Sequence, residues 1–167
     1  MKPHIQIDLA RQDLQWTSTE GEVRRFSVST AAAGAGELRG SERTPRGRHI
    51  VRAKIGADAP WGAVFVGRRH NGEIYSPELG AQFPQRDWIL TRILWLSGSE
   101  VGRNRLGNVD SMRRYIYIHG TPEEWRIGRP ASYGCIRMRS RDIIDLYQRV
   151  KVGTPVTVTP GYLPAYY

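Results

Sequence analysis

Two residues of this sequence combine the chemical types needed for nucleophilic catalysis: Cys135, the single cysteine, and His119. A thiol attacks as its thiolate, and because an unperturbed cysteine has a pKa of about 8.5, a nearby base must take the proton at neutral pH. His119 ends the apolar run RYIYIH, and Cys135 follows in the loop sequence ASYGC after Gly and Pro residues that let the chain turn back. The sequence therefore predicts that the imidazole and the sulfur meet, with His119 as the base.

The residues before the cysteine favour a shaped catalytic loop. Gly134 permits a backbone conformation closed to other residues, so that amides near Cys135 could converge on one oxyanion. Ser132 is expected to shape the same loop through a side-chain hydrogen bond to the backbone. The alternative interpretation is a small buried cysteine and a strand-end histidine without chemistry, because free cysteine is among the most buried residue types.

The order and spacing of these residues resemble the L,D-transpeptidase catalytic domain, the YkuD-like family of peptidoglycan enzymes. The family signature is a histidine, a spacer and then Ser/Thr-His-Gly-Cys; this chain has IHGT at His119 and SYGCIRM around Cys135. The resemblance covers nearly the whole chain and includes the segments IQIDLARQDLQ, Ser29-Thr30, Thr44-Pro45-x-Gly-x-His49, Arg92 to Leu96, and Gly107 to Asp110.

This resemblance implies a cysteine acyltransferase that cross-links the cell wall and thereby affects cell shape. Cys135 would attack a carbonyl of a donor stem peptide and form a thioester, with no cofactor. His119 would take the thiol proton and later activate the acceptor amine, and the backbone carbonyl of Gly120 would orient the imidazole. Attack by diaminopimelate of an acceptor stem gives a cross-link, whereas attack by water gives a carboxypeptidase or endopeptidase product. Carbapenems are the inhibitors that the resemblance implies.

Tyr133 departs from the family signature, which has a second histidine at this position. A tyrosine hydroxyl is uncharged near pH 7, with a reference pKa of about 10, so Tyr133 is expected to tune substrate fit rather than to transfer protons. A proteobacterial branch that resembles this sequence joins diaminopimelate to L-alanine instead of to a second diaminopimelate, and Tyr133 favours that hypothesis. The missing histidine and the basic charge also leave open a non-catalytic cell-wall binding module. A papain-like protease is disfavoured, because in that family the cysteine precedes the histidine.

Other residues are expected to bind substrate around the thiol. Arg137 matches the family's arginine after the cysteine, and its guanidinium would hold a substrate carboxylate or lock the loop. A loop-rich segment from Arg68 to Asp110 is expected to cap the site, because long irregular segments in compact domains are usually functional or mobile. The residues of this segment that we expect to line the site are Tyr75, Trp88, Arg103 and Arg105.

The elements that position these residues are mostly strands. Alternating apolar and polar residues predict a β-meander over residues 5–28 and further strands at 49–51, 63–66, 114–119 and 156–158. One helix follows the cysteine loop, with Ser140 as N-cap and Ile143, Ile144, Tyr147 and Val150 on its apolar face. The expected fold is mainly β: an L,D-transpeptidase-like β-sandwich of mixed sheets with one main helix and a loop-rich cap, in a single domain over residues 1–167.

The composition indicates which binding partners and which cellular compartment to expect. The net charge of +9 favours a polyanion, and carboxylate-rich peptidoglycan stem peptides fit this charge, as donor and acceptor alike. The arginines are dispersed and no nucleic-acid motif is present, so nucleic acid is disfavoured. The four histidines are scattered, which predicts no metal site. No apolar run is long enough to span a bilayer and no signal peptide is visible, yet the implied substrate predicts a periplasmic location.

Overall fold

A curled β-sheet makes up most of the protein. The computed structural model describes residues 2–161, and in this range ten strands join into one sheet in the order β3-β2-β1-β10-β4-β7-β5-β6, with β8 pairing β7 and β9 pairing β8. The strands are β1 His4–Asp8, β2 Asp13–Thr17, β3 Val23–Ser27, β4 Gly47–Ile55, β5 Ala63–Val66, β6 Arg69–Ile74, β7 Leu90–Gly98, β8 Tyr117–Gly120, β9 Ile136–Met138 and β10 Pro155–Thr159. Pairing is parallel between β1 and β10 and between β8 and β9, so the sheet is mixed.

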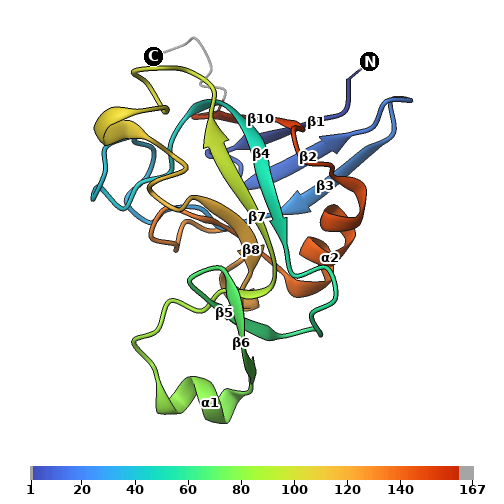
Figure 1. The fold of residues 1–167 in the computed structure, drawn as a ribbon, viewed down its shortest axis with the longest axis vertical. Helices are drawn as coiled ribbons and strands as arrows, with labels where there is room; N and C mark the ends of the chain where they lie inside the picture. The colour runs from blue at the N-terminus through green and yellow to red at the C-terminus, as the bar shows by residue number, and fades with distance from the viewer. Residues whose placement is uncertain (1, 162–167) are drawn as a thin grey trace.

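The curl brings both ends of the sheet around one core. Figure 1 shows β1 to β3 running behind β4 and β7. Residues from both layers, such as Ile7 and Leu14 from one and Leu94 and Ile118 from the other, are fully buried in the same hydrophobic cluster. The expected mainly β fold of mixed strand directions is confirmed, with the two layers supplied by one hydrogen-bonded sheet.

One helix of ten residues, α2 Ser140–Arg149, follows the cysteine loop as expected. It packs on β7 and β8 through an apolar face that includes Ile143 and Leu146, while Ile144 is only half-buried. Ser140 is not the N-cap: its hydroxyl lies 2.7 Å from the Thr91 hydroxyl, and its amide donates to the Glu124 carboxylate at 3.2 Å. The remaining helices among the described residues are short: α1 Pro77–Gln82, η1 Gly107–Val109 and η2 Glu124–Arg126.

The segment expected to cap the site is only partly a cap. Residues 90–98 form β7, which lies inside the sheet and pairs with β4, β5 and β8. The hairpin of β5 and β6, together with α1, projects from the sheet at the bottom of Figure 1. The strand expected from Arg114 starts only at Tyr117, because Tyr115 adopts a left-handed backbone with φ of 57°.

His49 anchors β4 against the loop before β8. Its side chain is buried, with Nδ1 3.0 Å from the Gly47 carbonyl and Nε2 2.9 Å from the Ser111 hydroxyl. A carbonyl only accepts, so Nδ1 carries the proton and Nε2 accepts from Ser111. Burial lowers the pKa of His49 to about 4, so the imidazole is neutral in the folded protein.

We expect His49 to make the fold sensitive to acid. The unfolded chain protonates His49 below its ordinary pKa of about 6.5 while the folded chain resists until about 4, so the free energy of unfolding falls as the pH drops through this window. The loss expected from this residue is about 3 kcal/mol. Urea unfolding of wild type and His49→Gln between pH 7 and 4 measures it, because the variant lacks this contribution. Identical pH dependence in both proteins would contradict the assignment.

Candidate active site

Cys135 and His119 lie on the same face of the sheet. In the parallel pair β8 and β9, Ile118 is paired with Ile136 and His119 with Arg137. Successive side chains alternate between faces, so His119 and Arg137 share one face and the core residues Ile118 and Ile136 share the other. Cys135 immediately precedes β9, and its Sγ accepts a hydrogen bond from the Tyr117 amide at 3.4 Å. Register therefore places the thiol and the imidazole on one face of the sheet.

The hydrogen bond of His119 fixes its tautomer. Nδ1 lies 2.7 Å from the carbonyl oxygen of Gly120 and must donate to it. Nε2 consequently carries the lone pair, and it is buried without a hydrogen-bond partner among the described residues. Burial lowers the pKa of His119, while the negative charge of Asp87 acts in the opposite direction. His119 is thus a neutral imidazole with an unoccupied basic nitrogen.

Cys135 is held as a neutral thiol. Burial raises its pKa to about 12, against the hydrogen bond from Tyr117 and the charges of Arg137 and Arg114. The Sγ also donates to the Tyr115 carbonyl at 3.4 Å, which only a protonated sulfur can do. The resting pair is therefore thiol and imidazole, and attack requires the proton to leave the sulfur during the reaction.

The loop before the cysteine is shaped by local hydrogen bonds. Gly134 has φ of 131°, which a side chain would strain, and its carbonyl accepts from the Thr44 hydroxyl at 2.9 Å. Ser132 donates its hydroxyl to the Cys135 carbonyl at 2.6 Å and accepts from the Gly134 amide at 3.2 Å. The amides of Tyr133 and Cys135 have no acceptor in the described part of the chain. They are free to donate to an oxyanion beside the sulfur.

Arg137 pairs with Asp87 instead of pointing into open solvent. Its Nη2 lies 3.1 Å from Asp87 Oδ1, and its Nη1 donates to the Ala131 carbonyl at 3.4 Å. The arginine side chain is only 8% exposed. Of the two expected roles, these contacts favour locking the cysteine loop to the segment before β7. Asp87 was not a candidate from the sequence, because nothing in an irregular stretch distinguishes one aspartate as the partner of Arg137.

Tyr133 stands between two cavities. One, of about 310 Å³, contains Cys135 and is bordered by Arg39, Arg113 and Arg114. The other, of about 70 Å³, is polar and is lined by Trp88, Arg137 and several neighbours. Tyr133 lines both cavities, is 61% exposed, and has the Arg137 guanidinium 5.7 Å from its ring centroid.

The other residues predicted to line the site differ in whether they border these two cavities. Trp88 is buried and lines the smaller cavity. Tyr75 packs edge-on against Trp88, with ring centroids 5.2 Å apart, and borders neither cavity. Arg103 and Arg105 also lie outside both cavities. The reason is that their segment turns away along the far end of β7, where Arg103 pairs with Glu100 at 3.6 Å.

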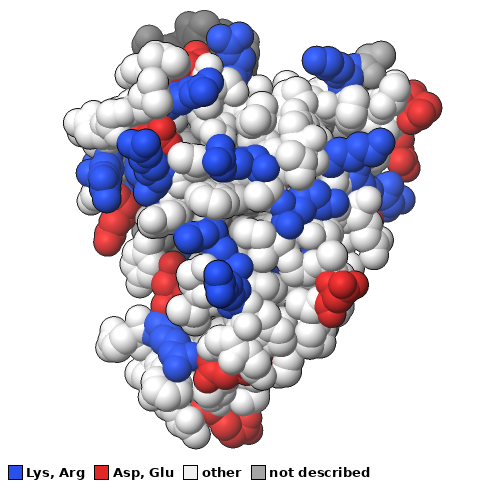
Figure 2. Space-filling view, viewed as in Figure 1, with Lys and Arg blue, Asp and Glu red and all other residues white. Residues whose placement is uncertain are grey.

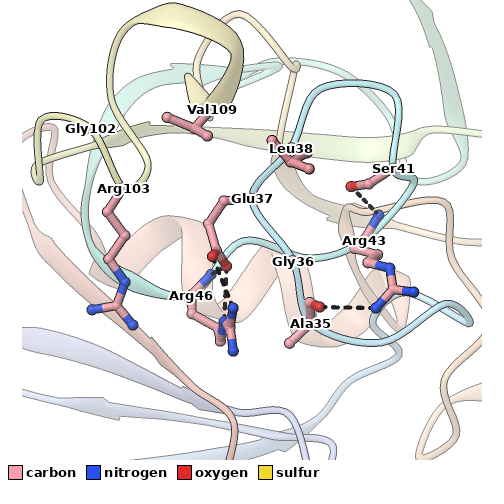
Figure 3. Close-up of a pocket in the computed structure, with 10 residues that line it drawn as sticks. All are labelled: Ala35, Gly36, Glu37, Leu38, Ser41, Arg43, Arg46, Gly102, Arg103 and Val109. Carbon is pink, nitrogen blue, oxygen red and sulfur yellow. Dashed lines mark hydrogen bonds and ion pairs between the residues drawn. The ribbon is translucent and has the colours of Figure 1, made fainter.

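The largest of the cavities described for residues 2–161 does not contain Cys135. It measures about 590 Å³ and lies under the loop of residues 35–46, with Arg103 on its far wall (Figure 3). Inside it Glu37 holds Arg46 through contacts of 2.9 and 3.0 Å, which neutralises much of its charge. Cys135 is absent from its lining, and no group of His, Cys, Asp and Glu within residues 2–161 could hold a metal ion.

Two residues that the sequence did not predict as part of the site lie against the cysteine and its neighbouring loop. Arg114 donates to the Arg43 carbonyl at 2.6 Å and to the Glu37 carbonyl at 3.2 Å, so it pins the 35–46 loop beside the thiol. Tyr117 supplies the amide that contacts the sulfur. The alternation of the run RYIYIH already places Tyr117 and His119 on one face, whereas only the fold shows where Arg114 reaches.

Comparisons with known proteins identify the family of this chain. A family model described as YkuD, L,D-transpeptidase catalytic domain, matches residues 2–158. The putative L,D-transpeptidase YkuD of Bacillus licheniformis is 44% identical over 48 residues, which are 29% of this chain and 29% of that protein. The probable L,D-transpeptidase YbiS of Escherichia coli K12 is 46% identical over 43 residues, 26% of this chain and 14% of that protein.

Solved structures share the fold. An L,D-transpeptidase from Mycobacterium smegmatis superposes with a TM-score of 0.54 at 19% identity, covering 95% of this chain and 58% of that one. L,D-transpeptidase 3 from Mycobacterium tuberculosis, in complex with a faropenem-derived adduct, has a TM-score of 0.56 at 16% identity over 94% of this chain and 60% of that one. Because the family model spans residues 2–158, we conclude that the chain belongs to the YkuD family of L,D-transpeptidase catalytic domains.

Proposed function

We propose that the protein is a peptidoglycan L,D-transpeptidase that joins stem peptides through a thioester on Cys135. The observation that carries this proposal is the His119 tautomer: Nδ1 donates to Gly120, which leaves Nε2 as a free base on the face that holds the thiol. A buried basic nitrogen without a partner is costly to maintain unless a reacting group uses it.

The first half-reaction forms the thioester. Cys135 Sγ attacks the carbonyl carbon of a donor stem peptide, and the thiol proton passes to His119 Nε2. The carbonyl oxygen becomes an oxyanion that the free amides of Tyr133 and Cys135 stabilise. When the tetrahedral intermediate collapses, the C–N bond breaks and the leaving amine takes the proton from His119.

The second half-reaction transfers the acyl group. The amine of an acceptor stem attacks the thioester, gives a proton to His119 Nε2, and releases the Cys135 thiolate, which takes that proton back. Diaminopimelate as the attacking residue gives the cross-link, either to a second diaminopimelate or to L-alanine of the first stem position. Water in place of the amine gives a carboxypeptidase or endopeptidase product from the same thioester.

The basic surface and the substrate suggest where the reaction occurs. Lys and Arg side chains cross the middle of one face, over β4 and β7, with acidic side chains toward its edges (Figure 2). Such a face favours carboxylate-rich stem peptides. Peptidoglycan lies outside the cytoplasmic membrane, so we place the activity in the periplasm. None of the helices among the described residues is long and apolar enough to cross a membrane.

Incubation with disaccharide-tetrapeptide tests the proposal directly. We expect tandem mass spectrometry to detect a cross-linked dimer, and its fragments identify the bond formed. Cys135→Ala should abolish the dimer, and His119→Gln should lower its rate by about 10²–10⁴-fold, the usual contribution of general base catalysis. Circular dichroism of both variants verifies folding. Trimmed stems without dimer would assign the hydrolase alternative, and no product at all would favour the binding module.

Alkylation with iodoacetamide tests the resting protonation state. Because the pKa of Cys135 is raised to about 12, the thiolate fraction should rise about tenfold per pH unit between pH 7 and 9, and the alkylation rate with it. A rate that is already constant below pH 8 would instead indicate a thiolate paired with protonated His119.

Carbapenem treatment tests Cys135 as an acylation site. Among the structural relatives, one L,D-transpeptidase was solved in complex with imipenem. We expect imipenem to add one adduct to this protein by intact mass, located on the peptide that contains Cys135, and to add none to Cys135→Ala. An adduct on another residue would contradict the assignment of the nucleophile.

A further inference from the structure

Arg68 reaches from the hairpin of β5 and β6 across to the active face. It occupies the hairpin turn, where Gly67 and Arg68 have φ of 55° and 65°, as both central residues of a type I′ turn require. Its guanidinium carbon lies 4.9 Å from the ring centroid of Trp95 and 4.8 Å from that of Tyr115. Two aromatic faces therefore hold the cation in one position.

The Arg68 guanidinium has unused hydrogen-bonding capacity. In the described part of the chain its only hydrogen bond runs from Nη1 to the Tyr117 hydroxyl at 3.1 Å. The neighbouring side chains that raise the pKa of Arg68 are those of Tyr117 and Tyr115, and no aspartate or glutamate is among them. Arg137 differs in this respect, because Asp87 already neutralises it. Arg68 is thus a fixed cation whose remaining N–H donors are available to an external anion.

The same two tyrosines connect Arg68 to the nucleophile. Tyr117 donates its amide to Cys135 Sγ and accepts from Arg68 at its hydroxyl. The carbonyl of Tyr115 accepts a hydrogen bond from the Cys135 thiol. Its ring lies beside Arg68, and Tyr115 lines the cavity that contains Cys135. The Arg68 guanidinium and the Cys135 sulfur therefore contact opposite ends of the same residue, Tyr117, whose side chain lies on the face of the thiol.

We propose that Arg68 binds a carboxylate of the donor peptide and thereby selects the residue that is acylated onto Cys135. This inference rests on the proposed function and deepens it. The ligand is a peptide whose acyl residue carries a second carboxylate at the end of its side chain, as a diamino diacid does. A guanidinium pairs with such a group through two parallel hydrogen bonds, and the rings that orient Arg68 reduce the entropy lost when the pair forms.

The competing explanation is that Arg68 only ties the hairpin to the sheet. The two roles predict different substrate dependence. A tether affects all donors alike, because it acts through the fold. A carboxylate-binding residue affects only donors that carry the carboxylate, because a neutral amide offers the guanidinium one weak acceptor in place of a charged pair.

The test compares two tetrapeptide donors that differ only in whether this distal carboxylate is free or amidated. Wild type should prefer the free acid in kcat/KM. Arg68→Met should lose about tenfold to a hundredfold on the free acid, the usual effect of a charged hydrogen bond, and retain its rate on the amide. Arg69→Met is the matched control, because Arg69 is the next residue, is exposed, and has no side-chain hydrogen bond or ion pair within residues 2–161. It should behave as wild type.

Equal losses on both donors, or no preference in wild type, would overturn the inference while leaving the transpeptidase proposal intact. Thermal unfolding of Arg68→Met detects a loosened hairpin. If wild type turns over neither donor, the proposed function fails. Calorimetric binding of both peptides to Cys135→Ala then tests separately whether Arg68 binds the carboxylate. A preference for the free acid that Arg68→Met removes would support the inference, and equal binding of both peptides would overturn it.

Discussion

The alternation of side chains along β8 is the constraint on which the rest of the structure depends. This strand lies between β7 and β9 and is buried throughout, so each of its residues must serve one of two faces. Ile118 faces the main core under α2, whereas Tyr117 and His119 face the thiol. A shift of one residue in register would move His119 into the apolar core and Ile118 to the face of the thiol. The core therefore fixes the position of His119, the proposed base.

Burial sets the resting protonation state of Cys135 and His119. Desolvation disfavours both charged forms, which keeps Cys135 as a thiol and His119 as a neutral imidazole in a protein of net charge +9. In the proposed mechanism, the proton leaves the sulfur only when a substrate carbonyl is in place for attack. Such a resting state protects the single cysteine from oxidation and alkylation, because the thiolate is the reactive form.

The arginines around the site divide into structural and available cations. Arg137 is neutralised by Asp87, and the N–H groups of Arg114 donate to carbonyls of the 35–46 loop. Both hold loops against the thiol. Arg68 is oriented equally well, but by aromatic rings and a hydroxyl, so its charge remains free. Among these three arginines, Arg68 is therefore the oriented cation without an acidic partner, while Arg137 and Arg114 hold loops in place.

The sequence by itself determined the family and most of the strand pattern. The paired motifs around His119 and Cys135 predicted the family, and local alternation predicted most strands and the helix after the cysteine loop, because both signals are short in range. It could not assign partners to dispersed charges or aromatic rings. Asp87 pairs with Arg137, Tyr75 packs against Trp88, and Arg68 reaches Trp95 only because the sheet curls and the hairpin folds back. Those contacts join segments far apart in the chain, so the tertiary structure alone decided them.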